Sequence, residues 1–366
     1  MAQAGERGMA VLDWRAGGVA CARAFLLEHS PAGKLALVFH GDTDGCTAAV
    51  ILVETLAAGG APEPLLLPPG KGENCFTPGF RERLEARQPA SLVVLDMGSR
   101  PQPILPRPIL VLDHHAVEGT PPGAVLVTSY RTLGFSTPTA ELARVVAEGL
   151  PGYQAERAQW LAALGVQADA GAAAPVPALA AAKARYGTRI MGRAAALVNA
   201  PRRSAGFKVM AAVAALQAAD SPTQIAELAL PEAKQLEVYR QEVEGELRRA
   251  RRAAPLFAGR VALLKFSSPC QVHGMVAASW ARRLAGYVVM AANVGYLPGK
   301  VSFAVRACEH VDLLHLLRGL EFERAEPNEY AHGHRAATGG SLACASFNRM
   351  LAALGFGPEA MVPEQP

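Results

Sequence analysis

LALVFHGDTDG, residues 35–45, is the stretch that decides the fold, because an apolar run in it ends directly at a group of polar side chains. Five consecutive apolar residues are typical of a strand that is buried on both faces of a parallel sheet. His40, Asp42 and Asp44 follow the run, and Gly45 permits a tight turn into an apolar helical pattern. Open α/β sheets build their sites at this end of a strand. The stretch therefore predicts a parallel α/β sheet with a polar site at its carboxyl edge.

Three further segments carry acidic or imidazole side chains that this edge would bring together. They are SLVVLD at 91–96, PILVLDHH at 108–115 and QADA at 167–170. The first two again follow apolar runs, so their polar ends belong at the same edge of the sheet. Carboxylate oxygens mixed with imidazoles suit Mn²⁺ or a similar divalent ion. Two such ions held close together are a device for phosphoester hydrolysis, so the four segments predict a binuclear metal centre.

Each segment taken alone also has a simpler interpretation. An aspartate in HGDTDG fits a helix N-cap as well as it fits a metal ligand. Asp96 fits a helix cap or a turn, helped by Gly98, and Asp169 fits a structural polar residue in a helical pattern. His114 and His115 fit a surface pair, but two adjacent imidazoles after a buried strand are uncommon, since neither is a good core residue. The combination of the four segments favours the metal site.

Length and composition set the class of protein. A chain of 366 residues with 51% hydrophobic and 19% charged residues is globular and long enough for two domains. Its formal net charge of +4 is compatible with an anionic substrate. Six cysteines without a CxxC pair predict reduced thiols and a cytoplasmic location. The N-terminus has no apolar core of the signal-peptide type, and the Ala-rich stretch 161–182 is rejected as a membrane span because it contains Gln167, Asp169 and two prolines.

The pattern along the chain predicts two α/β domains. From residue 35 to about 130, strand and helix patterns alternate, which is typical of a doubly wound parallel sheet. The pattern then becomes helical, and we assign the N-terminal domain to residues 1–230. Residues 231–254 predict one long connecting helix, which begins at a proline and ends in four arginines. Residues 255–366 predict a smaller α/β domain with a Gly-rich turn and a closing helix near its end.

The order of these motifs resembles that of the DHH phosphoesterase superfamily. The resemblance rests on H-x-D-x-D-G, a strand-ending D-x-G, D-H-H and a later lone aspartate. GHRAATGG at 333–340 resembles the G-H-x-x-A-x-G motif of the DHH-associated domain, and 273–307 resembles the segment of RecJ-type exonucleases that leads to a substrate-binding arginine. The resemblance covers about residues 35–354 and implies a DHH domain followed by a smaller substrate-binding domain. His332 stands where the family usually has a second glycine before the histidine.

The resemblance implies a ligand set for two Mn²⁺ ions, with Mg²⁺ as the alternative. The first ion would be held by His40, Asp42 and Asp96. The second ion would be held by Asp44, Asp96, His114 and Asp169. Asp96 would therefore bridge the two ions, and a water activated between them would attack the phosphorus. His115 would contact the scissile phosphate or protonate the leaving oxygen, and Asp113 would support the imidazoles by hydrogen bonding.

The same resemblance implies a substrate site in the second domain. The implied substrate-binding residues are Ser302, Arg306, Gly333, His334, Gly339 and Gly340. The last two glycines are expected before a helix, so their backbone amides would add an anion nest. Without the family pattern, Arg306 fits a surface salt bridge and His334 fits a capping or packing role. Arg202 and Arg203 fit either a contact to a phosphate backbone or solvated charge.

These expectations favour a Mn²⁺-dependent phosphodiesterase that removes mononucleotides from an end of single-stranded nucleic acid or a short oligonucleotide. A version with a small substrate, a cyclic dinucleotide or 3′-phosphoadenosine 5′-phosphate, is the alternative. In another class, the chain would be an inactive scaffold relative, but such relatives are expected to lose metal ligands and this sequence keeps all six. A pyrophosphatase is disfavoured, because that branch has a different second domain and a wider His-to-Asp spacing. No membrane partner is expected, and a monomer and an oligomer both fit the sequence.

Overall fold

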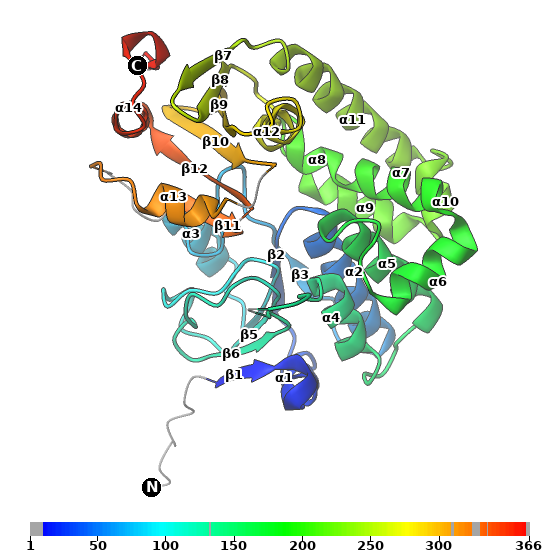
Figure 1. Cartoon of the computed structure of the whole chain (residues 1–366). Helices are drawn as coiled ribbons and strands as arrows, with labels where there is room; N and C mark the ends of the chain where they lie inside the picture. The colour runs from blue at the N-terminus through cyan, green and yellow to red at the C-terminus, as the bar shows by residue number, and fades with distance from the viewer. Residues whose placement is uncertain (1–9, 132, 309–310, 324–329, 335, 364–366) are drawn as a thin grey trace, which may run out of the picture. The chain divides into compact units, whose positions relative to one another are not determined.

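The computed structural model describes residues 10–131, 133–308, 311–323, 330–334 and 336–363. Figure 1 traces the chain, which divides into two compact units. One unit consists of Met1–Arg202 with Phe207–Val238, and the other of Arg203–Gly206 with Tyr239–Pro366. A six-stranded sheet lies at the centre of each unit and is packed against helices. The predicted fold class, two α/β domains, is confirmed.

The sheet of the first unit is parallel throughout its described strands. Its order is β1-β6-β5-β4-β2-β3. The strands are β1 (Ala10–Asp13), β2 (Leu35–Phe39), β3 (Leu65–Leu66), β4 (Ser91–Leu95), β5 (Ile109–Asp113) and β6 (Ala124–Thr128). All residues of β2, β4 and β5 are buried, as their unbroken apolar runs predict. These three strands are neighbours, so their carboxyl ends meet at one edge of the sheet.

Helices cover both faces of this sheet, which confirms the doubly wound pattern. The helices of this unit are α1 (Val19–His29), α2 (Thr43–Ala58), α3 (Pro78–Ala86), α4 (Thr139–Ala147), α5 (Ala155–Asp169), α6 (Pro177–Tyr186), α7 (Thr188–Val198), α8 (Ala200–Arg203), α9 (Val209–Ala218) and α10 (Pro222–Ala226). Leu37 of β2 belongs to the core that α1, α2, α4 and α5 share, whereas its neighbour Val38 packs into the core beneath α3. A π-helical turn, Trp14–Gly18, joins β1 to α1. Among the described residues, no helix combines the length and the apolar character that crossing a membrane requires.

The long helix predicted over 231–254 is α11 (Pro231–Ala250). Its residues up to Val238 belong to the first unit and those from Tyr239 onward to the second. The helix ends before the predicted residue, since a turn follows Ala250 and Pro255 opens the next strand. Proline cannot continue a helix, and it also disfavours helical geometry in the residue before it.

The sheet of the second unit is mixed. Its order is β11-β12-β10-β9-β8-β7, and among these strands only β8 and β9 pair in parallel. The strands are β7 (Pro255–Ala258), β8 (Val261–Phe266), β9 (Val288–Leu297), β10 (Lys300–Arg306), β11 (Tyr330–His334) and β12 (Ala337–Ala343). The helices are α12 (His273–Ala281), α13 (Leu313–Arg318) and α14 (Cys344–Ala353), with a 3₁₀ turn at Pro358–Ala360.

The Gly-rich segment near the C-terminus differs from the expectation. The sequence predicts a turn before a helix, but Gly339 and Gly340 lie inside β12, paired with β10 on one side and β11 on the other. A Cβ atom on Gly339 would lie 2.3 Å from the carbonyl oxygen of Phe303 on β10. The glycine is therefore explained by the close approach of a neighbouring strand. Inside a paired strand its amide cannot contribute to a nest before a helix, which corrects that part of the prediction.

Candidate metal centre

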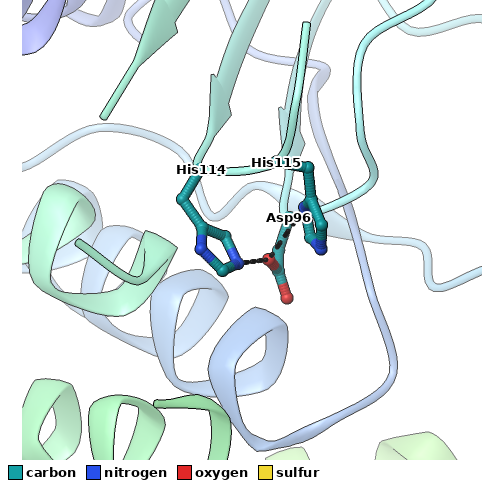
Figure 2. A group of neighbouring side chains, drawn as sticks. All are labelled: Asp96, His114 and His115. Carbon is teal, nitrogen blue, oxygen red and sulfur yellow. Dashed lines mark ion pairs between the residues drawn. The ribbon is translucent and has the colours of Figure 1, made fainter. Parts of the chain in front are cut away.

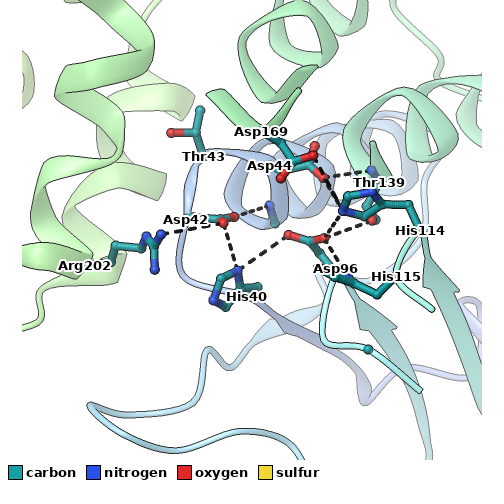
Figure 3. A network of polar contacts seen from close by, with 12 residues as sticks. His40, Asp42, Thr43, Asp44, Asp96, His114, His115, Thr139, Asp169 and Arg202 are labelled. Carbon is teal, nitrogen blue, oxygen red and sulfur yellow. Dashed lines mark hydrogen bonds and ion pairs between the residues drawn. The ribbon is translucent and has the colours of Figure 1, made fainter. Parts of the chain in front are cut away.

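The parallel ladder of the first unit brings the expected ligands to one place. His40 follows β2 directly, and its N–H donates to the carbonyl oxygen of Leu95 at 3.1 Å. Asp96 follows β4 directly, and its N–H donates to the carbonyl oxygen of Leu112 at 3.1 Å. These two bonds continue the ladder past the strand ends, so His40, Asp96 and the neighbouring His114 lie side by side at the carboxyl edge (Figure 3).

The first turn of α2 supplies two further aspartates. Asp42 is the N-cap of the helix, and its Oδ1 accepts a hydrogen bond of 3.1 Å from the N–H of Gly45. Asp44 lies in the first turn and is almost fully buried. A Cβ atom on Gly45 would lie 2.2 Å from the carbonyl oxygen of His40, so the tight connection from strand to helix requires glycine. Asp42 is therefore a helix cap, as the simpler interpretation predicts. It is also part of the cluster, because its other oxygen, Oδ2, lies 2.9 Å from His40 Nδ1.

The carboxylate of Asp96 lies at the centre of the cluster. Its Oδ1 is 3.2 Å from His114 Nε2, and its Oδ2 is 3.6 Å from His40 Nδ1. Figure 2 shows Asp96 between His114 and His115. Nδ1 of His115 is 3.9 Å from Asp96 Oδ1. Asp96 has a φ of 62°, in the left-handed region that residues other than glycine rarely adopt. Such backbone geometry at a polar cluster is typical of functional sites.

One compact group of potential ligands lies on the His40 side of Asp96. The ligand atoms of His40, Asp42 and Asp96 lie within 4.8 Å of one another. His40 Nδ1 is 2.9 Å from Asp42 Oδ2. Arg202 of α8 approaches the same atom with Nη2 at 4.0 Å, and its Nε donates to Asn199 Oδ1 at 2.8 Å. The sequence left Arg202 between a phosphate contact and solvated charge, and its contact with Asp42 at the start of α2 is visible only in the fold.

A second compact group lies on the other side of Asp96. The ligand atoms of Asp96, His114 and His115 lie within 4.8 Å of one another. The other two expected ligands of this side are slightly farther away, with Asp169 Oδ2 at 3.8 Å and Asp44 Oδ2 at 3.9 Å from His114 Nε2. All six expected ligand side chains are thus brought together. His115, which was expected to contact the phosphate and not the metal, also lies within this group.

His115 is oriented by Asp113, the last residue of β5. His115 Nδ1 lies 3.0 Å from Asp113 Oδ1, and the backbone N–H of His115 donates to Asp113 Oδ2 at 3.1 Å. Asp113 Oδ1 also accepts a hydrogen bond of 3.2 Å from the N–H of Gly98, in the loop after Asp96. The Asp113 carboxylate therefore fixes the imidazole of His115 and links the loops that follow β4 and β5.

Asp44 makes a contact that its sequence position did not predict. Its Oδ2 accepts a hydrogen bond of 2.8 Å from the N–H of Thr139, and its Oδ1 accepts one of 2.9 Å from the N–H of Ala140. Both amides belong to the first turn of α4, whose own N-cap residue, Pro138, offers no side-chain hydrogen bond. The Asp44 carboxylate thus stabilises the N-terminus of α4, where the helix dipole favours negative charge. Each oxygen keeps a further lone pair for a metal ion.

Asp169 is the last residue of α5, where the helix dipole disfavours a carboxylate. Gly165 lies one turn earlier on the same face of this helix. A Cβ atom on Gly165 would lie 2.7 Å from Asp44 Oδ1 and 2.5 Å from the Cβ of Ala140. The bare backbone at this position lets α5 approach the starts of α2 and α4 closely, which brings Asp169 to the cluster.

The charges in the cluster are unbalanced. Burial alone would lower the pKa of His40, but the carboxylates of Asp42 and Asp96 outweigh it and raise the pKa to about 10. Burial is likewise outweighed at His114, where Asp96, Asp44 and Asp169 raise the pKa to about 10. Burial and the neighbouring Asp96 carboxylate raise the pKa of Asp44 well above its usual range. The carboxylates outnumber the positive charges around them, so the cluster favours bound cations. In the metal-free chain these cations are the protons on the imidazoles of His40 and His114.

One atom gives a direct test of whether a metal ion fits. His114 Nε2 is buried and makes no hydrogen bond among the described residues, although Asp96 Oδ1 lies 3.2 Å away. A buried ring nitrogen without a hydrogen bond is costly unless another partner satisfies it. Its surroundings of carboxylate oxygens and imidazoles are the donor set that Mn²⁺ and similar ions accept. The residues therefore fit divalent metal ions.

The expected substrate-binding residues of the second unit lie on neighbouring strands. Ser302 and Arg306 are four residues apart on β10, so they share one face of the sheet. Ser302 Oγ is 2.8 Å from Ser341 Oγ on β12. Arg306 Nη1 donates to the carbonyl oxygens of Val305 at 2.8 Å and Thr338 at 3.2 Å, and burial lowers the pKa of its guanidinium.

The histidine motif of the second unit is only partly described. The backbone of Gly333 and His334 lies in β11, and both His334 and Arg306 pair with Ala337 from opposite sides of β12. The side chain of His334 lies outside the described residues, as does Arg335 of the same motif. The backbones of Arg306 on β10 and His334 on β11 are therefore separated by one strand, β12.

Solved structures with a similar fold include two RecJ proteins. RecJ of Thermus thermophilus in complex with Mn²⁺ has a TM-score of 0.68 at 21% identity, with 95% of this chain and 55% of that chain covered. An exonuclease RecJ bound to manganese has a TM-score of 0.61 at 22% identity, with coverages of 92% and 93%. The chain thus spans about half the length of the Thermus thermophilus protein and nearly all of the other.

The DHH domain of a protein described as a member of a family of ribosomal proteins is also similar. It has a TM-score of 0.61 at 15% identity, with 93% of this chain and 89% of that chain covered. No family model matches the sequence, and no curated protein matches it. The three structures show that the chain has the two-domain, RecJ-like fold of DHH proteins.

Proposed function

We propose that this chain is a metal-dependent phosphodiesterase of the DHH superfamily, which hydrolyses single-stranded nucleic acid or short oligonucleotides from an end. The observation that carries the proposal is the placement of Asp96, whose two carboxylate oxygens face different histidines at 3.2 and 3.6 Å. A carboxylate shared by two groups of ligands is the feature that a pair of adjacent ions requires.

The ions would be held by the six side chains that the fold gathers. These are His40, Asp42 and Asp96 on one side, and Asp44, Asp96, His114 and Asp169 on the other. When bound, divalent ions such as Mn²⁺ supply the positive charge that activates a water and stabilises negative charge on the phosphate. Mg²⁺ suits the carboxylates but is less suited to imidazole, so Mn²⁺ is the ion we expect.

The histidines also define the side from which a substrate approaches. The side chains of His40 and His115 are 40% and 35% exposed, whereas those of Asp96 and His114 are 2% and 5% exposed. A phosphodiester that approaches the open side would meet His115 before the buried carboxylates. Asp113 orients this imidazole through Nδ1, and we assign the imidazole of His115 to contact with the scissile phosphate or to protonation of the leaving oxygen.

Arg306 is the residue of the second unit that best fits a phosphate. Both of its described side-chain hydrogen bonds go to carbonyl oxygens, so neither compensates the charge of the guanidinium. A partly buried guanidinium in this state favours an anion, and its fork of donors matches phosphate oxygens. Ser302 on the same face of β10 and His334 on β11 would complete the contacts to a terminal nucleotide.

The comparisons support nucleic acid as the substrate class. One neighbouring structure is described as an exonuclease RecJ bound to manganese, and this chain covers 93% of it. The inactive scaffold alternative is disfavoured, since the side chains that bind metal in the proposal are all present and gathered around Asp96.

The test is a hydrolysis panel with Mn²⁺. It compares single-stranded DNA and RNA of about 20 nucleotides, a 5′-labelled dinucleotide, a cyclic dinucleotide and 3′-phosphoadenosine 5′-phosphate. We expect stepwise release of mononucleotides from the long strands. Hydrolysis of only the dinucleotide or the small nucleotides would mean that the substrate is a small nucleotide and not a polymer. An absence of Mn²⁺-stimulated hydrolysis of every member would contradict the proposal.

A further inference from the structure

Thr139 lies between two of the expected metal ligands. It is the first residue of α4 and is fully buried. Its hydroxyl donates to Asp96 Oδ1 at 3.2 Å, and its backbone N–H donates to Asp44 Oδ2 at 2.8 Å (Figure 3). One residue thus contacts the carboxylate at the centre of the cluster and a second carboxylate at its buried side.

The bond to Asp96 determines which way that carboxylate faces. Asp96 must direct Oδ1 toward His114 and Oδ2 toward His40 to serve both groups of ligands. The torsion that sets this direction is broad in aspartate and has no strong preference of its own. A donor fixed in the core at Oδ1 selects one orientation, and the hydroxyl of Thr139 is such a donor.

A simpler interpretation is that Thr139 caps its own helix. Threonine often uses its hydroxyl to accept a backbone N–H at the start of a helix. Here the amides that a capping hydroxyl of Thr139 would serve, those of Glu141 and Leu142, donate to the carbonyl oxygen of Pro138 at 3.1 and 3.2 Å instead. The hydroxyl donates to a carboxylate 43 residues away in the sequence, so its contact is tertiary and directed at the cluster.

We propose that Thr139 is a positioning residue of the metal centre, whose hydroxyl holds the Asp96 carboxylate in the orientation that both ions need. The inference rests on the proposed function, because it takes Asp96 as a shared ligand. Partners that orient metal ligands typically change metal affinity by about 10–100-fold when they are removed. We expect an effect of about that size from loss of the hydroxyl.

The discriminating substitutions are Thr139→Val and Thr139→Ser. Valine keeps the branched shape and the backbone amide that binds Asp44, but it removes the donor to Asp96. Serine keeps the donor. The control is Tyr330→Phe in the second unit, because Tyr330 is also buried and its hydroxyl donates to a backbone carbonyl, that of Leu317, at 2.6 Å.

The experiment is a calorimetric titration of the metal-free full chain with Mn²⁺, together with thermal unfolding of each metal-free variant. We expect Thr139→Val to weaken Mn²⁺ binding about 10-fold or more, Thr139→Ser to restore it, and Tyr330→Phe to leave it near the wild-type value. Substrate KM at saturating Mn²⁺ should change little in Thr139→Val, since the residue is buried away from the open side.

Two results would overturn the role of Thr139 alone: unchanged Mn²⁺ affinity in Thr139→Val, or an equal loss in Tyr330→Phe. Failure of the wild-type chain to bind Mn²⁺ would instead overturn the metal centre and the proposed function with it. If Thr139→Val does not fold, Thr139→Ala takes its place under the same criteria, because it also removes the hydroxyl and keeps the amide.

Discussion

His114 Nε2 lies 3.2 Å from Asp96 Oδ1, yet it is buried and makes no hydrogen bond in the described part of the chain. Protein folds rarely leave a buried ring nitrogen in this state. The same nitrogen also faces Asp44 and Asp169 at 3.9 and 3.8 Å. Three carboxylates around one imidazole nitrogen leave a position that a divalent cation satisfies better than a proton does, because a cation is able to bond to several of them at once.

The first prediction concerns this nitrogen. We expect His114→Ala to weaken Mn²⁺ binding and to lower kcat by more than about 100-fold, since loss of a ligand costs more than loss of a partner that orients one. His315→Ala is the control, because His315 lies exposed on α13 in the second unit. Mn²⁺ titration and a hydrolysis assay on both variants provide the measurement. Wild-type activity in folded His114→Ala would show that the site is assigned wrongly.

The second prediction concerns protons. The pKa values of His40 and His114 are raised to about 10, so both imidazoles are protonated in the metal-free chain at neutral pH. A metal ion binds the neutral imidazole, so binding must release about one proton for each histidine that becomes a ligand. Mn²⁺ affinity should therefore rise as the pH increases from about 7 toward about 9.

Calorimetry in two buffers of different ionisation enthalpy near neutral pH measures this release directly. The apparent enthalpy of Mn²⁺ binding should differ between the buffers by an amount proportional to the protons released. Equal enthalpies in both buffers would mean that His40 and His114 are neutral before the metal binds, or that neither is a ligand.

The third prediction separates the substrate site from the metal site. Arg306→Ala should raise the substrate KM by about 10–100-fold, because a hydrogen bond to a charged group contributes about 1.5–3 kcal/mol. Mn²⁺ affinity should not change, since Arg306 belongs to the second unit and the six ligands to the first. Arg282→Ala is the control, because Arg282 is an exposed arginine of the same unit. An unchanged KM in Arg306→Ala would exclude Arg306 from substrate binding.

The parts of the fold that the sequence predicts well are those with local signals. The five-residue apolar runs of β2, β4 and β5 identify buried parallel strands, and the polar residues after them identify the site edge. The sequence does not predict the strands β1 and β7. Each has only four residues and lies at the edge of its sheet, so neither has the long buried run that would distinguish it.

Other features depend on contacts that no local pattern contains. ATGGSLA at 337–343 contains two glycines and is typical of a turn, but the requirement for Gly339 comes from the backbone of β10. Asp44 fits an N-cap of the helix that follows it, whereas its carboxylate binds the start of α4, 95 residues away. The stretch STPT at 136–139 fits a Ser/Thr helix cap in the sequence, whereas the hydroxyl of Thr139 donates to the distant Asp96, a contact that no local pattern predicts.

The last prediction concerns Gly165, where alanine would normally stabilise a helix by about 1 kcal/mol. Here the added Cβ would lie 2.7 Å from Asp44 Oδ1 and 2.5 Å from the Cβ of Ala140. Neither atom moves easily, since the N–H of Ala140 binds that oxygen and α4 is packed in the core. Overpacking of this kind costs about 1–3 kcal/mol, so we expect Gly165→Ala to lower the free energy of unfolding.

The same clash should also weaken Mn²⁺ binding, because it displaces α5 and with it Asp169, one turn farther along. The matched control is Gly192→Ala on α7, where a Cβ would meet nothing within 4 Å. There the ordinary helix preference applies, and we expect a gain of up to about 1 kcal/mol with unchanged Mn²⁺ affinity. Denaturant unfolding and Mn²⁺ titration of the two variants form the test. If Gly165→Ala and Gly192→Ala change stability and Mn²⁺ affinity equally, the close approach at Gly165 is not what positions Asp169.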